Sequence, residues 1–330
     1  MADDRDRPVL AVTAGDPCGI GPEIVLKALT DERTIGAARL LVVGDEHWMR
    51  ATARRLRMRW PFGAPAASDA DRRWDKPRLL DLKNVDASLL PGQISALAGR
   101  ASAETIERAV ELVLEGRAAA IVTAPIHKEA LSLADYHDPG ASELLARLTA
   151  SRQVASVFLA PDFAVAILTE HLSLRESLPK VRKNRIVTHL KLLDREWQRL
   201  FRSRPRIVVS ALNPHAGAGG RFGIEETREI EPAVDAARAA GLIVYGPEPA
   251  DTVFVRARDG EFDLVLAMYH DQAMLPMKLL FGRRAVLLTV GLPFVRTAAD
   301  HGPALDIAGK GMANPESMVQ AILAAARLSG

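Results

Sequence analysis

The sequence predicts an α/β fold in which mainly parallel sheets are covered by helices. Short apolar runs typical of buried strands alternate with longer segments of helical periodicity along most of the chain, and this alternation is the pattern of βαβ units. The chain has 330 residues, more than one hydrophobic core usually holds, so two domains are expected. The composition, 48% hydrophobic, 25% charged and 5% aromatic, excludes a disordered or fibrous chain.

Charge and cysteine content exclude several classes of protein. The chain carries 43 basic and 41 acidic residues, and the net charge of +2 is too small to indicate nucleic acid or an acidic membrane as a partner. Cys18 is the single cysteine, so no disulfide within the chain is available, and the sequence assigns this residue no role. Neither a signal segment in residues 1–8 nor a run of membrane-spanning length is present, so we expect a cytoplasmic protein.

The first domain is predicted to cover residues 1–135, with residues 300–330 returning to complete it. Strands are expected at residues 9–13, 40–43 and 120–124. Helices are expected at residues 22–29, 47–57 and 101–114, after residue 128, and finally at 315–328. The Pro/Ala-rich connection at 61–77 is expected to be a flexible surface loop.

The second domain is predicted to cover residues 136–299, with helices at 184–201 and 225–240. Three of its strand-like runs end on a histidine, at His171, His215 and His270. In open α/β sheets, ligands bind beyond the carboxyl ends of the strands, and neutral imidazole is the commonest side-chain metal ligand. Together the three histidines predict one metal site, although each alone is better explained as a polar residue where the chain leaves the core.

Four further groups of residues each allow two interpretations. The glycine spacing in segments 15–23 and 217–223 is not that of a dinucleotide-binding motif. The first segment is therefore either a tight turn or an anion site. We interpret the second as a loop that holds His215. His127 and Lys128 are catalytic or merely begin a helix. A last group, polar residues after apolar runs, fits a metal or hydroxyl site as well as ordinary turns and caps; its members are Asp251, Asp271, His301 and Asp306.

The string Asp300–Pro315 resembles the adenosine-binding loop of isopropylmalate and isocitrate dehydrogenases. Four more sequence segments, at 15–23, 213–217, 269–272 and 291–297, also resemble motifs of the 4-hydroxythreonine-4-phosphate dehydrogenase family of pyridoxal phosphate biosynthesis. With them, the resemblance to this family covers residues 8–328. The resemblance implies a two-domain isopropylmalate dehydrogenase-like fold and a homodimer whose active site lies between domains at the subunit interface.

The resemblance also implies roles for individual residues. His171 and His215 of one subunit and His270 of the other would bind a divalent metal, either zinc, magnesium or cobalt. Catalytic roles are implied for Asp251, Asp271 and Lys278, and Lys278 and Arg296 suit an anionic substrate. The adenosine part of the cofactor would be held by His301, Gly302, Asp306, Ile307 and Asn314. Lys310 is the one cation inside that loop, so NAD is expected rather than NADP.

The chain departs from the family on the substrate side. Where the family has a histidine and a threonine that contact substrate, this chain has Ala141 and Ser142, and an asparagine is matched by Leu287. A lost hydrogen bond to a charged group costs about 1.5–3 kcal/mol, so two losses would weaken phosphate binding by roughly two to four orders of magnitude.

We therefore expect an NAD-dependent, metal-dependent dehydrogenase that oxidises a secondary alcohol beside a carboxylate on a small anionic hydroxy acid, with decarboxylation, in the manner of the enzyme of pyridoxine biosynthesis. One alternative is an enzyme similar to terephthalate cis-dihydrodiol dehydrogenase, which acts in aromatic catabolism. A second is a non-catalytic sensor that binds metal and ligand on the same scaffold. The metal and the physiological substrate are left open.

Overall fold

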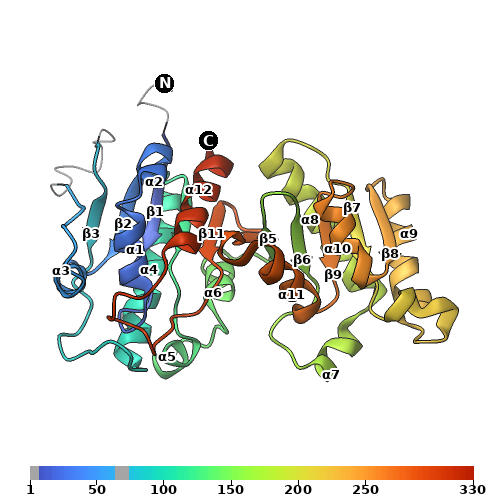
Figure 1. Cartoon of the computed structure of the whole chain (residues 1–330), viewed down its shortest axis with the longest axis horizontal. Coiled ribbons are helices and arrows are strands. Elements are labelled where there is room, and N and C mark those ends of the chain that lie inside the picture. The colour runs from blue at the N-terminus through green and yellow to red at the C-terminus, as the bar shows by residue number, and fades with distance from the viewer. Residues whose placement is uncertain (1–6, 64–73) are drawn as a thin grey trace. The chain divides into compact units, whose positions relative to one another are not determined.

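The computed structural model describes residues 7–63 and 74–330, which form two compact units. Unit 1 comprises Met1–Arg152 and Leu292–Gly330, and unit 2 comprises Gln153–Gly291 (Figure 1). Unit 1 extends beyond the expected limits at 135 and 300 because α6 (Ala141–Leu148) packs on α4 (Ala96–Leu114) and β11 (Val295–Ala299) pairs with β4 (Ala120–Thr123). Most of the expected loop at 61–77 falls on residues 64–73, outside the described residues.

The described strands of unit 1 form a parallel sheet in the order β3-β2-β1-β4-β11. The strands not yet bounded are β1 (Val9–Thr13), β2 (Arg39–Gly44) and β3 (Arg78–Asp81). Every residue of β1 is buried, as expected for a central strand whose two faces are both covered.

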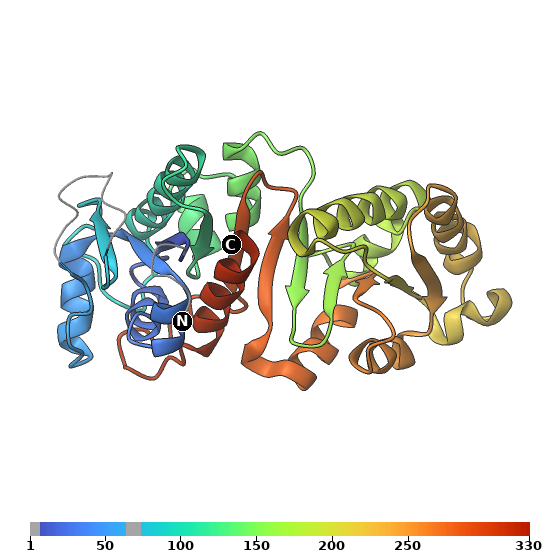
Figure 2. The same cartoon turned by 90° about the horizontal axis from the view of Figure 1, so that it is seen from above.

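Helices cover both faces of this sheet (Figure 2). The helices of unit 1 besides α4 and α6 are α1 (Gly21–Ala28), α2 (Glu32–Ala37), α3 (Glu46–Arg55), α5 (Lys128–Leu133) and α12 (Glu316–Ser329). Helix α4 packs on β1, β2 and β4, while α12 packs on β1, β4 and β11 together with α1 and α2. Helix α12, late in the sequence, therefore covers the sheet to which the first strand, β1, belongs.

Unit 2 has a mixed sheet in the order β10-β5-β6-β9-β7-β8. Its strands are β5 (Ala155–Leu159), β6 (Ala164–Ile167), β7 (Ile207–Ser210), β8 (Val244–Glu248), β9 (Leu264–Ala267) and β10 (Val286–Val290). Strand β5 is antiparallel to both β10 and β6, whereas β6, β9, β7 and β8 run parallel. The three histidine-ending runs supply β6, β7 and β9, so these strands direct their carboxyl ends to one edge of the sheet.

The helices of unit 2 complete its core. They are α7 (Leu174–Ser177), α8 (Lys183–Phe201), α9 (Glu231–Ala239), α10 (Ala250–Arg258) and α11 (His270–Phe281). Short 3-10 turns lie at Leu178–Lys180 and Gly282–Arg284, a π-helical turn at Glu226–Ile230, and an irregular, mostly left-handed segment at Pro214–Gly220. An apolar cluster joins β6 and β9 to α10 and α11, and Phe262 and Met277 are buried in it. This cluster fixes the start of α11 beside the end of β6.

Helix α4 shows how packing extends an element beyond its sequence pattern. The periodicity predicts a start at residue 101, but α4 begins at Ala96, where the Ser95 side chain accepts a hydrogen bond from the Leu97 N–H at 3.2 Å. Gly99 lies inside the helix because a Cβ there would stand 1.9 Å from the carbonyl oxygen of Ala130. The glycine therefore permits close packing of α4 on α5 and does not end the helix.

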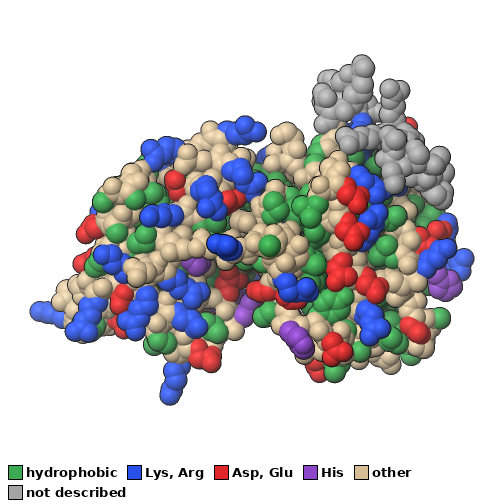
Figure 3. All heavy atoms as spheres, turned by 180° about the vertical axis from the view of Figure 1, so that it is seen from behind, with side chains coloured by type: hydrophobic (Ala, Val, Ile, Leu, Met, Phe, Trp, Pro, Cys, Tyr) green, Lys and Arg blue, Asp and Glu red, His purple; other side chains and the backbone are tan. Residues whose placement is uncertain are grey.

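The structure confirms the predicted α/β fold with mainly parallel pairing covered by helices. Over one face, Lys and Arg side chains are interspersed with Asp and Glu (Figure 3), in keeping with the small net charge of +2. Within the described parts of the chain, each helix is too short or too polar to cross a membrane.

Candidate active site

Unit 2 contains a pocket of about 200 Å³ where β6 and β9 end. Its lining residues are His171, Leu172, Leu174, Ser177, Tyr269, His270 and Asp271. Parallel pairing places the two strand ends together, and the Thr169 hydroxyl donates a hydrogen bond to the Met268 carbonyl at 2.7 Å. The rings of His171 and His270 consequently stand 6.1 Å apart between centroids.

His270 is oriented by the residue that follows it. Its Nδ1 is 2.8 Å from Oδ1 of Asp271, an arrangement that directs the opposite ring nitrogen, Nε2, away from the carboxylate. The first turn of α11 is also held by Gln272, which accepts from the Met268 N–H and donates to the Ala211 carbonyl, both at 2.7 Å. The expected catalytic residue Asp271 is thus placed beside an expected metal ligand.

Both His171 and His215 have a left-handed backbone, with φ of 51° and 53°. This conformation is uncommon for residues other than glycine, and such outliers concentrate at functional sites. His215 opens a run of five left-handed residues through Gly219, where each non-glycine residue costs roughly 1–2 kcal/mol. Contacts from the surrounding structure must therefore offset this cost, as expected for a loop whose conformation matters to its function.

The described residues of one chain do not assemble a complete metal-binding cluster. No group of three or more His, Cys, Asp or Glu side chains in residues 7–63 and 74–330 is arranged to hold an ion. His171 and His270 meet at the pocket, whereas the ring of His215 contacts that of Phe222, with centroids 6.0 Å apart. The donors are imidazoles, which suit zinc or cobalt better than magnesium.

Three other expected residues of unit 2 lie on helices and on the sheet. Asp251 is exposed in the first turn of α10, and Lys278 is exposed on α11, two turns after Asp271. Leu287 lies on β10 opposite Phe158 and packs, half-buried, against the apolar cluster of the unit. Leucine at this position therefore adds to the core of unit 2.

Unit 1 contains a buried arginine near the start of β11, whose side chain reaches the last residue of β4. Arg296 on β11 is 3% exposed and donates to the Thr123 hydroxyl at 2.6 Å and the Ser142 hydroxyl at 3.1 Å. Burial lowers the pKa of Arg296 to about 10, against the opposing effect of the nearby Glu143 carboxylate. The guanidinium is thus a buried cation positioned in part by two hydroxyls, and its planar fork is a geometry that suits an anion.

Helix α6 brings the two substituted substrate positions to this arginine. Ala141 and Ser142 are the first two residues of α6, and its N-cap, Gly140, offers no side-chain cap. Ser142 contacts Arg296 through its hydroxyl, while the methyl group of Ala141 provides no hydrogen-bonding atom. The expected substrate residues Ser142 and Arg296 are therefore brought together, with an apolar residue beside them.

The expected cofactor loop is held against α1 by a buried ion pair. Glu23 on α1 is 1% exposed and pairs with Lys27 at 2.8 Å. Glu23 accepts from the N–H groups of Gly311 and Ala313 at 3.3 and 2.9 Å, and Lys27 donates to the carbonyls of the same two residues at 2.9 and 2.7 Å. The glycine-rich segment 15–23 and the loop 300–315 therefore form one structural feature.

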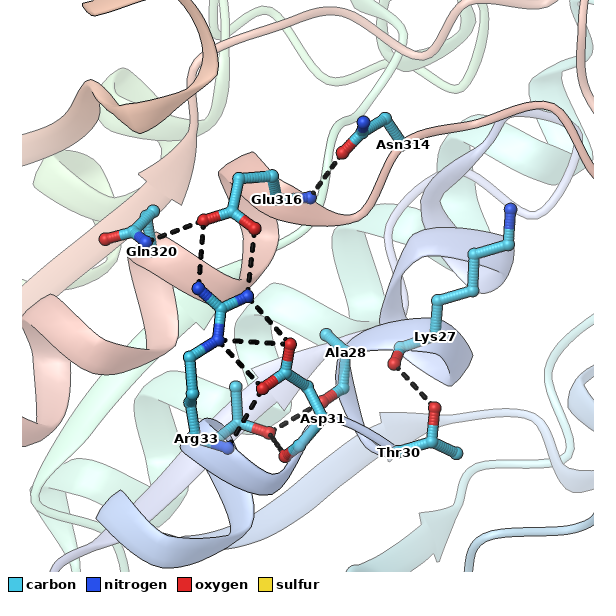
Figure 4. Close-up of polar contacts among 9 residues, drawn as sticks. Lys27, Ala28, Thr30, Asp31, Arg33, Asn314, Glu316 and Gln320 are labelled. Atoms are coloured by element: carbon cyan, nitrogen blue, oxygen red, sulfur yellow. Dashed lines mark hydrogen bonds and ion pairs between the residues drawn. The ribbon is translucent and has the colours of Figure 1, made fainter.

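The end of this loop is fixed by a second polar network (Figure 4). The Asn314 side chain accepts from the Glu316 N–H at 2.9 Å, and Arg33 bridges Glu316 and Asp31 with distances of 2.9 and 2.8 Å. Earlier in the loop, His301 and Asp306 are exposed, and His301 Nδ1 is 3.0 Å from the Gly302 carbonyl. Asn314 thus organises the start of α12, while His301 and Asp306 present polar groups to solvent.

Sequence reasoning missed several residues that shape these sites. Tyr269 and Leu174 line the pocket of unit 2, and Thr123 is the closest described hydrogen-bond partner of Arg296. Asp16 is fully buried, with Oδ1 accepting from the Cys18 N–H at 2.8 Å and Oδ2 lacking a described partner. Thr123 ends a strand as the histidines do, so extending the strand-end rule to hydroxyls would have found it.

Comparison with known proteins identifies the family. The family described as pyridoxal phosphate biosynthetic protein PdxA matches residues 36–325. The chain belongs to this family. D-threonate 4-phosphate dehydrogenase of Salmonella typhimurium is 43% identical over 328 residues, which cover 97% of this chain and 98% of that protein.

Comparison with solved structures agrees with this family assignment. The crystal structure of 4-hydroxythreonine-4-phosphate dehydrogenase from Klebsiella pneumoniae is 42% identical, covers 98% of this chain and 99% of its own, and has a TM-score of 0.91. A terephthalate 1,2-cis-dihydrodiol dehydrogenase from Burkholderia xenovorans shares the fold, with 24% identity, a TM-score of 0.64, and coverage of 96% of this chain and 98% of its own. The family resemblance is confirmed, and the relatives support a dehydrogenase.

Proposed function

We propose that this chain is an NAD-dependent and divalent-metal-dependent dehydrogenase that oxidises a secondary alcohol beside a carboxylate and releases carbon dioxide. The observation that carries the proposal is the pocket of unit 2, in which His171 and His270 face each other and Asp271 orients His270. A metal site of this kind agrees with a dehydrogenase family.

The metal would be held by imidazoles from two copies of the chain. Two histidines of the pocket are too few for a stable site, and the described residues of one chain supply no third ligand there. The set we propose is His171 and His215 of one copy with His270 of the other, so the His270 of each chain would serve the site of the other copy and not the His171 that lies 6.1 Å from it in its own chain. The proposal therefore includes a homodimer. When bound, the metal supplies Lewis-acid polarisation of the alcohol oxygen and of the ketone that replaces it.

The nicotinamide cofactor would bind to unit 1 along the loop 300–315. The exposed carboxylate of Asp306 suits ribose hydroxyls, and the exposed side chain of His301 and backbone of Gly302 and Ile307 border the same loop. The Glu23–Lys27 pair fixes the loop before cofactor arrives. The cofactor accepts the hydride, and the protein contributes orientation.

Residues of the chain bind the anion and handle the proton. Arg296 and Lys278 would pair with the carboxylate and the second anionic group of the substrate. Asp251, Asp271 and Lys278 are the candidates for removing the hydroxyl proton and later protonating the carbon that loses carbon dioxide. With the alcohol on the carbon β to the carboxylate, transfer of its C–H hydrogen as hydride to the nicotinamide and of its hydroxyl proton to one of these groups leaves a β-keto acid. The bond between the α-carbon and the carboxylate then breaks, carbon dioxide departs, and the α-carbon takes up a proton.

We propose a phosphorylated four-carbon hydroxy acid as substrate, because the relatives named above act on D-threonate 4-phosphate and 4-hydroxythreonine-4-phosphate. Ala141 and Leu287 favour a second candidate, a ring carboxylate such as a cis-dihydrodiol, because apolar groups leave phosphate oxygens unpaired at a cost.

The test is turnover of a small substrate set by the purified protein. NADH formation would be followed with D-threonate 4-phosphate, 4-phosphohydroxythreonine and a cis-dihydrodiol carboxylate, before and after chelation and after zinc or cobalt is restored. We expect activity on a phosphate ester that disappears with the metal. Binding of these compounds without NADH formation would instead establish a non-catalytic sensor.

A further inference from the structure

The loop that carries His215 is held by a buried glutamate from the element that follows it. Glu226 is fully buried. Its Oε1 accepts from the N–H groups of Leu212 and Asn213 at 2.9 and 2.7 Å, and its Oε2 accepts from Nδ2 of Asn213 at 2.8 Å. All of these bonds are to the two residues that lead from β7 into the loop, so one carboxylate sets the direction in which the loop leaves the sheet.

The same carboxylate contacts the middle of the left-handed run. Gly217 is buried with φ of 76°, and a Cβ on it would lie 2.8 Å from Oε2 of Glu226. Glycine is therefore required there both by the backbone conformation and by the approach of the carboxylate. Glu226 thus contacts the loop on both sides of His215.

Glu226 also begins a π-helical turn, Glu226–Ile230, before α9. Such turns are rare and frequently occur at functional sites. The adjacent Glu225 accepts from Nδ2 of Asn213 at 2.8 Å, and this hydrogen bond lowers the pKa of Glu225. Two carboxylates therefore converge on the amide of Asn213, two residues before His215.

From this geometry we propose that Glu226 is a positioning residue for the metal site: it holds the 213–219 loop in its left-handed form and so sets the direction of the His215 imidazole. The inference rests on the proposed function, in which His215 binds the metal. A left-handed run containing His215, Ala216 and Ala218 has little local preference, so contacts from outside the run must maintain it. A charged acceptor with several N–H donors is the strongest such contact available to the backbone.

The test uses the full-length protein as the wild type and three variants: Glu226→Gln, His215→Ala and Glu196→Gln. In Glu226→Gln the new amide would face Nδ2 of Asn213, donor against donor, so the loop loses that contact while its shape is nearly conserved. Glu196 is a matched control because it too is a buried glutamate of unit 2, at 5% exposure, but it pairs with Arg195 and Arg199 on α8.

Each variant would be loaded with Co²⁺ to record the visible absorption of the bound ion, and zinc affinity would be measured by competition with a chromophoric chelator. Thermal unfolding of the metal-free proteins would be measured in parallel. We expect Glu226→Gln to change the Co²⁺ spectrum and to weaken zinc binding at least about tenfold, and Glu196→Gln to keep the wild-type spectrum and affinity even if it is less stable.

The outcomes separate the inference from the proposed function. If Glu226→Gln unfolds at lower temperature but keeps the wild-type spectrum and affinity, Glu226 is structural only and the inference fails while the metal site stands. If His215→Ala binds metal as wild type does, the proposed site is wrong and the inference falls with it. Should Glu226→Gln not fold, Asn213→Ala removes the shared amide alone and is expected to shift the spectrum in the same direction; an unchanged spectrum would then overturn the inference.

Discussion

The two units hold their candidate site residues in opposite ways. In unit 1, Arg296 is 3% exposed and hydrogen-bonded to hydroxyls of neighbouring elements. In unit 2, the side chains of His270 and Asp271 are 44% and 75% exposed, and His171 lies in a strained backbone conformation. The first arrangement is buried before a ligand arrives, whereas the second is oriented by its own hydrogen bonds but remains open to solvent, where a bound group or a second chain could cover it. Changes in unit 1 should therefore alter affinity for the anion, and changes in unit 2 should alter the presence of the metal.

The largest effect is expected from removing a proposed metal ligand. His215→Ala should lose most bound metal and reduce turnover by at least about a thousandfold, because the metal is proposed to polarise the reacting oxygen. Metal content by mass spectrometry and the rate of NADH formation would be measured together. His189→Ala, a histidine of α8 that does not line the pocket, is the control. Full metal occupancy and wild-type rate in His215→Ala would place the site elsewhere.

A smaller effect is expected from the buried cation of unit 1. Arg296→Lys keeps a positive charge but cannot reproduce the forked hydrogen bonds of the guanidinium. The loss of about 1.5–3 kcal/mol for a charged hydrogen bond predicts roughly a ten- to hundredfold lower kcat/KM. Metal content should not change. A variant whose kcat/KM equals that of the wild type would remove Arg296 from the substrate site.

The next prediction concerns the apolar substitutions. Ala141→His with Leu287→Asn should raise kcat/KM on the phosphate substrate at least about tenfold, or roughly 1.4 kcal/mol. Because Leu287 packs against the core of unit 2, Leu287→Asn alone should also lower the free energy of unfolding, and the single variants must be compared. If the wild type already turns over the phosphate efficiently and the double variant is slower, the two substitutions have no bearing on substrate choice.

A further prediction for unit 1 concerns the preference for NAD over NADP. We expect NAD to be preferred, but Arg55 on α3 approaches the loop closely, since a Cβ on Gly309 would lie 3.1 Å from its Nη1. Residual use of NADP should therefore fall several-fold in Arg55→Gln, with NAD kinetics unchanged, because a 2′-phosphate needs a cation. Arg54→Gln is the neighbouring control. Equal kcat/KM with NADP and NAD in the wild type would contradict the preference.

The smallest effects are in stability, and they have opposite signs in the two units. Burial raises the pKa of Asp16 above 3.8. The favourable contribution of Asp16 to the free energy of unfolding is therefore present below pH 3.8 and is lost as pH rises through the pKa of the folded state. For Asp263, burial is outweighed by hydrogen bonds from Arg206, and the pKa is lowered. Its contribution is present above 3.8 and is lost as pH falls through the folded pKa.

Urea unfolding between about pH 2 and pH 7 checks these signs, because the Asp263 contribution changes below 3.8 and the Asp16 contribution above it. As pH rises, the free energy of unfolding of Asp16→Asn should increase relative to that of the wild type. The free energy of unfolding of Asp263→Asn should decrease relative to that of the wild type, by less than about 1 kcal/mol because the Arg206–Asp263 pair is partly exposed. The same sign for both variants would contradict the assignment.

The sequence predicted the strands, but not all of the contacts made where they end. Parallel strand ends bring His171 and His270 to one pocket, whereas His215, predicted for the same site, contacts Phe222, and the metal role of the three stays a prediction. Nothing in the run Glu225–Ile230 distinguishes Glu226 from a surface glutamate, because its burial arises from the loop that folds over it. The burial of Arg296 likewise depends on α6, and the sequence assigned both to the second domain although they belong to unit 1.

The return of residues 292–330 to unit 1 has a consequence for biosynthesis. Unit 2 is one continuous stretch of chain, and domains fold as they emerge from the ribosome. Unit 1 begins first, yet β4 lacks its neighbour β11, and β1 and β4 lack their cover α12, until residues 295–329 are made. The order in which the two units are completed is thus the reverse of the order in which they are begun. The unfinished sheet of unit 1 is therefore the surface that a chaperone would meet on the nascent chain.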